Sequence, residues 1–115
     1  MHKTDINKLI KYSDDKPQKE IFYDSGGLKA QVVCLKAGQI IPPCKMTNDV
    51  LFYIIEGNGE ITVDNKKEAL FAGVSVIVSK EAESRSISAK IDMVILAVQS
   101  KGKTYQIFHY SQRAA

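Results

Sequence analysis

The side chains best suited to chemistry in this chain are a thiol and a thioether placed close together. Cys44 and Met46 lie two positions apart, so their side chains share a face if the segment is a strand. A thiolate and a thioether are ligands that Cu(I) prefers. Cysteine and methionine are also common apolar fillers of a protein interior. The pair therefore leaves three interpretations open, namely core packing, redox chemistry of Cys44 and a weak copper site, of which core packing is favoured.

Imidazole is scarce, and this limits the reactions that the chain can support. The only histidines are His2 and His109, far apart in the sequence. Metal enzymes of the zinc and iron type usually gather several histidine and carboxylate ligands around one open site. No serine, histidine and aspartate have a spacing that suggests a triad. The catalytic residues, if there are any, stay unknown, and we lean towards a protein that is not an enzyme.

Glycines divide the middle of the chain into two regular frames. The first runs from Gly38 to Gly57, and the second begins at Gly73. Their spacing resembles the two cupin motifs, G-x5-H-x-H-x3-4-E-x6-G and G-x5-P-x-G-x2-H-x3-N, over about residues 28–98. The resemblance implies an all-β, single-domain double-stranded β-helix, or jelly roll. It also implies tight turns at Gly57 and Gly73, where a glycine takes a positive φ without strain.

The metal ligands of the two motifs are missing, although the glycines remain. The four positions that would carry three histidines and a glutamate hold Cys44, Met46, Val50 and Ser84. Valine cannot bind a metal ion, and a neutral serine is a poor ligand. The resemblance therefore implies a cupin-like barrel with degenerate motifs, no metal site and no cofactor.

Arg85 competes with Ser84 for the last of these positions. The apolar residue after the motif histidine normally follows two places later, whereas Ile87 lies three places after Ser84. A loop longer by one residue would put Arg85 inside the barrel, where a guanidinium binds carboxylate or phosphate through two hydrogen bonds. The favoured alternative is an exposed arginine on an edge strand, near Glu81 or Glu83.

Alternating apolar residues and frequent turns predict about nine or ten short strands. The predicted strands cover residues 21–23, 28–35, 51–55, 60–63, 66–71, 74–78, 84–88, 93–98 and 104–110. We assign residues 20–115 to the barrel domain and 1–19 to a polar N-terminal segment that packs on or across it. In that segment Ile6, Leu9 and Ile10 have helical spacing, and Asp5 is a suitable helix cap.

The stretch 51–55 is apolar on both faces, although a small barrel has only one interior. Leu51, Tyr53 and Ile55 would face outwards and need a cover. The N-terminal segment could supply part of it, either in the same chain or swapped from a partner. We therefore expect burial on both faces of this strand, and a homodimer.

Composition excludes several classes of protein. The chain has 115 residues, a charged fraction of 25% and a net charge of +3. Its basic residues are interleaved with acidic ones and lack aromatic neighbours, which argues against nucleic acid as a partner. It has no apolar run long enough for a membrane span, and its polar N-terminus does not resemble a targeting peptide. Two cysteines without a repeated spacing suit reduced thiols, so we expect a cytoplasmic protein.

Three functional hypotheses remain. The favoured one is a metal-free barrel that binds a small molecule, with the site formed by Cys44, Met46, Val50, Phe52 and either Ser84 or Arg85. The second is an enzyme that uses polar residues at the barrel mouth, such as Asn48, Asp49, Ser84 and Arg85. The third is a structural or interaction module whose barrel is filled by side chains.

Overall fold

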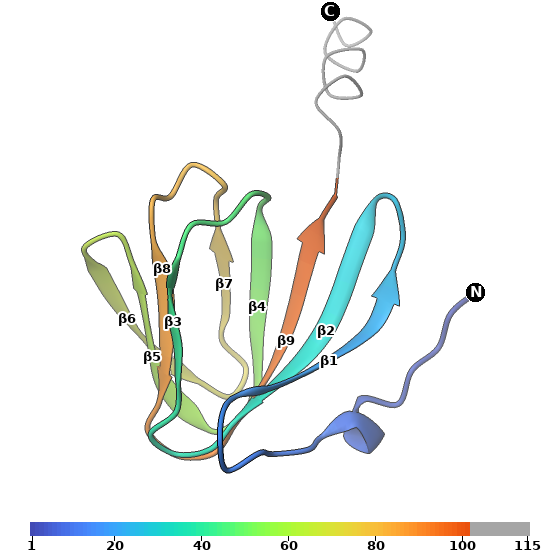
Figure 1. Cartoon of the computed structure of the whole chain (residues 1–115), viewed down its shortest axis with the longest axis horizontal. Coiled ribbons are helices and arrows are strands. Elements are labelled where there is room, and N and C mark those ends of the chain that lie inside the picture. The colour runs from blue at the N-terminus through green and yellow to red at the C-terminus, as the bar shows by residue number, and fades with distance from the viewer. Residues whose placement is uncertain (102–115) are drawn as a thin grey trace, which may run out of the picture.

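Two antiparallel sheets face each other across an apolar interior in the computed structural model, which describes residues 1–101 (Figure 1). The five-stranded sheet has the order β1-β2-β9-β4-β7, and the four-stranded sheet has the order β3-β8-β5-β6. The strands are β1 (Gln18–Asp24), β2 (Leu28–Leu35), β3 (Ile40–Cys44), β4 (Val50–Glu56), β5 (Asn58–Val63), β6 (Lys66–Phe71), β7 (Ser75–Val78), β8 (Arg85–Ala89) and β9 (Met93–Ser100). The predicted all-β, two-sheet jelly roll is confirmed.

Strand β3 is the element that alternation did not reveal. It contains Pro42 and Pro43, which donate no backbone hydrogen bond and are rare inside sheets. The strand accommodates them because it lies at a sheet edge and its register with β8 shifts between Ile41 and Cys44. The strand predicted at 104–110, and His109 within it, lie outside the described residues.

Alternation along β4 points one row of side chains into the barrel. Val50, Phe52 and Ile54 are buried there and belong to the main core. On the other face Tyr53 is 39% exposed, so the expectation that this strand is buried on both faces is wrong for the chain by itself. Ile55 is half-buried and packs in a second cluster that also includes residues of the N-terminal segment.

The N-terminal segment packs against the outer surface of the larger sheet. A short 3-10 helix, η1 (Ile6–Leu9), follows Asp5, whose carboxylate accepts a hydrogen bond from the backbone N–H of Asn7. The predicted helix and its cap are therefore confirmed. Ile6 and neighbouring apolar residues pack on a second core cluster formed by Val32, Cys34 and Val94 of β2 and β9. Within one chain, this segment covers part of the outer face.

Tyr12 ties the end of this segment to β4, and its titration should report the contact. Its hydroxyl lies 3.4 Å from Oε1 of Glu56. Desolvation and the charge of Glu56 raise the pKa of Tyr12 to about 12. Because the unfolded chain releases this proton near pH 10, the contact's contribution to stability should be complete below pH 10 and vanish as the pH rises towards 12. We expect a late tyrosinate step in an ultraviolet titration that disappears in Tyr12→Phe; an unchanged titration curve would contradict the contact.

The rest of the outer face motivates the expected homodimer, which we propose as the state in solution. Leu51 pairs with Ile77, which is 71% exposed, and Tyr53 lies on the same face. Sedimentation at micromolar concentration should give a dimer, because apolar surface of this kind is typical of stable interfaces. Ile77→Glu should shift the protein to a monomer, whereas Ile91→Glu, which changes an isoleucine in the turn between β8 and β9, should not. A monomeric native protein would refute the proposal.

Candidate functional site

Arg85 begins β8 and points into the barrel. The strand is paired on both sides, with Arg85 opposite Cys44 of β3 and opposite Val63 of β5. Arg85 is only 7% exposed, like the buried Ile87 two residues later. The favoured expectation of an exposed arginine on an edge strand is therefore wrong, because β8 is an inner strand and the parity of Arg85 directs it inwards.

Ser84 lies outside the cavity. It is half-buried just before β8, and its backbone N–H donates a hydrogen bond to Oδ1 of Asp64, 3.1 Å away. The N–H of Glu83 donates to the same oxygen. Asp64 therefore fixes the loop before β8. Arg85, rather than Ser84, occupies the interior position for which the motif spacing allowed either residue.

The guanidinium of Arg85 meets sulfur and an aromatic ring where a carboxylate would be expected. Its Nη2 lies 3.0 Å from Sδ of Met46 and 3.6 Å from Sγ of Cys44, and its carbon lies 5.6 Å from the centre of the Phe52 ring. Sulfur is only a weak hydrogen-bond acceptor. The other two nitrogens, Nε and Nη1, are buried and have no hydrogen-bond partner among residues 1–101. The group is thus a buried cation with unused donors.

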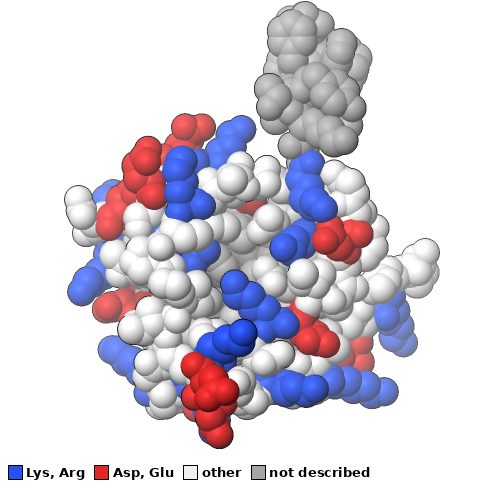
Figure 2. Space-filling view, in the orientation of Figure 1, with Lys and Arg blue, Asp and Glu red and all other residues white. Residues whose placement is uncertain are grey.

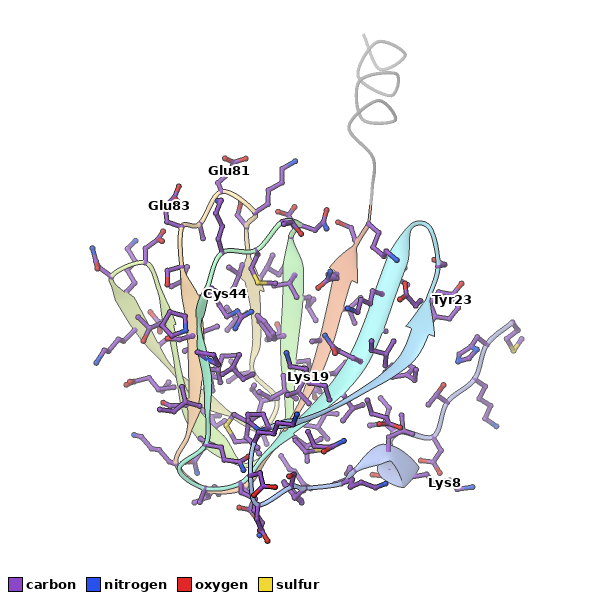
Figure 3. All side chains as sticks on the ribbon, viewed as in Figure 1. Lys8, Lys19, Tyr23, Cys44, Glu81 and Glu83 are labelled. Carbon is purple, nitrogen blue, oxygen red and sulfur yellow. The ribbon has the colours of Figure 1, made fainter. Side chains whose placement is uncertain are left out.

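No acidic side chain neutralises this cation within the described part of the chain. The ion pairs found there join Lys36 to Asp14, Lys67 to Glu60 and Lys101 to Asp24. The glutamates expected near Arg85, Glu81 and Glu83, are exposed and stand on the loop above the barrel in Figure 3.

A small cavity of about 40 Å³ adjoins the guanidinium. Its lining combines apolar and polar side chains, and consists of Lys19, Gln31, Val33, Ile41, Met46, Val50, Phe52, Arg85, Ala97 and Gln99. By the volume that each enclosed water needs, it has room for roughly three water molecules. Because Lys19 is exposed, the cavity reaches the surface on the β1 side.

Sequence reasoning missed the polar half of this lining. Gln31 pairs with Ala97 and Ile21, which places it on the inner face of β2, and Gln99 pairs with Val50 on the inner face of β9. Each lies two residues along its strand from a buried residue on the same face, Val33 for Gln31 and Ala97 for Gln99. A polar residue at a strand position where alternation otherwise places buried apolar side chains was therefore the signal that could have identified them.

The residues predicted for the site are only partly brought together. Val50 and Phe52 are buried in the cavity wall, and Met46 is half-buried against the core. Cys44 is exposed, so the favoured core-packing interpretation is wrong for it. The reason is that β3 is an edge strand whose pairing is interrupted at the prolines, which leaves its last residue beside the cavity and open to solvent. The other cysteine, Cys34, is buried.

Of the four polar residues considered for an enzyme, only Arg85 lines the cavity. The carboxylate of Asp49 accepts a hydrogen bond of 2.8 Å from the backbone N–H of Lys80 and so holds the ends of two strands together. Neither Asn48, Asp49 nor Ser84 lines the cavity.

A larger groove of about 460 Å³ opens beside the cavity, between the start of β1 and β3. It is lined by Lys16, Pro17, Gln18, Lys19, Ile41 and Pro42, and it shares Lys19 and Ile41 with the cavity. Figure 2 shows basic side chains near the centre of the face in view, next to a hollow. Figure 3 places Lys19 and Cys44 within the outline of the barrel.

The interior does not fit a transition metal. Residues 1–101 contain no group of three histidine, cysteine, aspartate or glutamate side chains placed to share an ion. Arg85 stands on the inner face next to Cys44 and Met46, and a guanidinium is a permanent cation that only donates hydrogen bonds. It would repel a metal ion bound to those two sulfur atoms.

We expect protein purified from metal-replete medium to carry well below one transition-metal ion per chain, because the donor set lacks the ligands and charge that retain such ions. Elemental analysis measures this directly. Stoichiometric iron, manganese, nickel or zinc that is lost in Cys44→Ser would contradict the expectation. Copper that is lost in both Cys44→Ser and Met46→Leu would instead support the copper hypothesis.

Comparison with known proteins identifies the fold. No protein-family model matches the chain, and no curated protein matches it in sequence. Solved structures do match: an RmlC-like cupin protein from Desulfovibrio desulfuricans has a TM-score of 0.79 at 19% identity, over 88% of this chain and 97% of that one. A conserved protein of unknown function from Streptococcus pyogenes has a TM-score of 0.77 at 20% identity, over 88% of both chains. A protein with a double-stranded β-helix domain from Klebsiella pneumoniae has a TM-score of 0.78 at 15% identity, over 87% of this chain and 90% of that one.

These likenesses show that the chain has the cupin fold, as the glycine frames predicted. None of the helices in residues 1–101 is long and apolar enough to cross a membrane.

Proposed function

We propose that this cupin-fold barrel binds a small carboxylate, whose acid group is held by Arg85. The observation that carries the proposal is the buried guanidinium whose Nε and Nη1 have no hydrogen-bond partner among residues 1–101. An unpaired charge and unused donors are costly in an interior, so a site of this kind is suited to an anion that supplies both charge and acceptors. A bidentate carboxylate fits the planar fork of donors.

The shape of the cavity supports a small ligand. A space of about 40 Å³ takes an acid group and little more, so the rest of the ligand would extend along the adjoining groove towards Lys19. Gln31 and Gln99 offer amide donors for the second face of the acid group, and Phe52 and Val50 offer apolar contact. Among the described residues that line the cavity there is no acid–base pair, so we propose a binding protein rather than an enzyme.

The proposal includes a metal-free, cytoplasmic protein. Two free thiols, one buried and one exposed, suit a reducing compartment. The alternative of a structural module with a filled barrel differs from the binding proposal in one respect. In that alternative, the space beside Arg85 accepts nothing other than water.

Calorimetric titration with short carboxylates tests the proposal. Formate, acetate and 2-oxo acids should bind the native protein and compete with each other, whereas the corresponding amides and chloride should not. Binding should weaken on the order of tenfold to a hundredfold in Arg85→Met, which loses a charge-assisted pair of hydrogen bonds. Lys90→Gln is the matched control, because it removes one exposed positive charge from the turn after β8. Equal binding to the native protein and Arg85→Met would refute the proposal.

A further inference from the structure

We infer that Cys44 is a nucleophile directed towards small carboxylates that carry an electrophilic carbon. The inference rests on the proposed function, because Arg85 would hold the acid group while the neighbouring thiol reacts. It adds covalent chemistry to a site that would otherwise only bind.

The geometry places one thiol, and not the other, beside the anchor. Nη2 of Arg85 lies 3.6 Å from Sγ of Cys44. A carboxylate bound through two neighbouring nitrogens uses Nη2 together with either Nε or Nη1, so it would replace one of the two weak sulfur contacts of Nη2 and lie next to Cys44 in both arrangements. Cys44 is exposed and can be reached from solvent, whereas Cys34 is buried in the second core cluster.

An exposed cysteine does not by itself indicate a ligand site. The buried guanidinium of Arg85 is the second, independent observation that indicates one. Arg85 is 7% exposed and lines the cavity, and two of its nitrogens are buried without a hydrogen-bond partner in the described part of the chain. Met46 accepts from the same Nη2 at 3.0 Å and keeps the guanidinium beside the thiol. The remaining contact of Cys44 Sγ is the backbone oxygen of Lys45 at 3.6 Å, so no side chain other than Arg85 is hydrogen-bonded to the thiol within residues 1–101.

The reaction is an attack of the thiolate on a carbon next to the held acid group. With a 2,3-unsaturated carboxylate, the sulfur bonds to the third carbon, the π pair moves to the second carbon, and that carbon takes up the proton that the thiol released to water. With a 2-halo carboxylate, the carbon–sulfur bond forms as the carbon–halogen bond breaks, and halide leaves. Neither route needs an oxidant, a reductant or a metal ion.

Alkylation by a matched pair of reagents tests the inference in the full chain. Iodoacetate carries the acid group, and iodoacetamide is its neutral counterpart. Rates at Cys44 are measured at low ionic strength by mass spectrometry of the Cys44 peptide, with the Cys34 peptide as an internal control. An unassisted thiolate prefers the neutral reagent, whereas Cys44 should react faster with iodoacetate.

Arg85→Met should lower the iodoacetate rate roughly tenfold or more and leave the iodoacetamide rate nearly unchanged, because only the charged reagent uses the anchor. Lys90→Gln should change neither rate by more than a small factor, because Lys90 is exposed to solvent and does not line the cavity. In the native protein, acetate should slow iodoacetate more than iodoacetamide, and this measurement does not depend on the folding of any variant.

The outcomes separate the two proposals. If acetate binds by calorimetry but Cys44 prefers iodoacetamide in the native protein, the nucleophile inference is overturned and carboxylate binding stands. If acetate does not bind and the two reagents keep the same rate ratio in Arg85→Met, both are overturned. Iodoacetate preference that disappears with Arg85 or with added acetate supports the inference.

Discussion

Gly57→Val should lower the free energy of unfolding by roughly 3 kcal/mol or more, and it is expected to be among the most damaging single changes in the chain. Gly57 joins β4 to β5 with a φ of 88°, a conformation that valine adopts only with strain. A side chain there would also collide with backbone, because an added Cβ would lie 2.1 Å from the carbonyl oxygen of Asp92 and 2.8 Å from Cα of Met93. The colliding atoms lie at the start of β9 and in the residue just before it, and β9 is held between β2 and β4, so they cannot easily move away.

Gly73→Val is the matched control, because it introduces the strain of valine at a positive φ without a steric collision. Gly73 has a φ of 93°, but an added Cβ there would meet nothing within 4 Å. This variant should lose only about 1–3 kcal/mol, the cost of a strained backbone. Chemical denaturation of the three proteins measures both effects. Equal losses in the two variants would contradict the close approach of Gly57 to β9.

The second large effect should have the opposite sign: Arg85→Met is expected to stabilise the protein in buffer without carboxylate. Burying a cation without a partner costs free energy, and even a buried ion pair can often be replaced by apolar side chains of similar size with a gain of about 1–4 kcal/mol. Arg85 is 7% exposed and lies against Phe52 and Met46, which can pack on a methionine. Stability lost to a functional charge is typical of binding sites.

Added acetate should reduce the difference in stability between Arg85→Met and the native protein. A ligand that binds only the folded state stabilises it by RT ln(1 + [L]/Kd), about 2.7 kcal/mol at a concentration of one hundred times Kd. The native protein should therefore gain in melting temperature with acetate, Lys90→Gln should gain equally, and Arg85→Met should not respond. A large loss of stability in Arg85→Met without acetate would show that the guanidinium serves the fold and would count against the anion site.

The sequence was informative where backbone geometry determines residue type. Gly57 and Gly73 have the positive φ that the two motif frames require, and this spacing predicted the fold without any matching ligand. Strands such as β2 and β6 were located at their observed bounds, since alternation and turn residues depend only on local structure. The pair of prolines concealed β3, because their presence in a strand depends on an edge position that only the assembled sheet reveals.

The site was harder to predict, because it depends on which residues of different strands meet. Arg85 was recognised as an alternative to Ser84, but its burial follows from β8 lying between β3 and β5. Cys44 was expected inside since its spacing placed it inwards, yet solvent reaches it at the edge of the sheet. Gln31 and Gln99 became site residues only when the register across β2, β9 and β4 placed them in one cavity wall.

The most direct test of the account is the side-chain Nε–H resonance of Arg85 during a titration with acetate. The chain has two arginines, Arg85 and Arg113, so protein labelled with nitrogen-15 should give two such signals, and the one absent from Arg85→Met belongs to Arg85. If a carboxylate fills the cavity, this proton gains a charge-assisted hydrogen bond, and its resonance should move downfield in a saturable manner while the other signal stays in place. An Arg85 signal that does not move up to high acetate concentration would contradict the account.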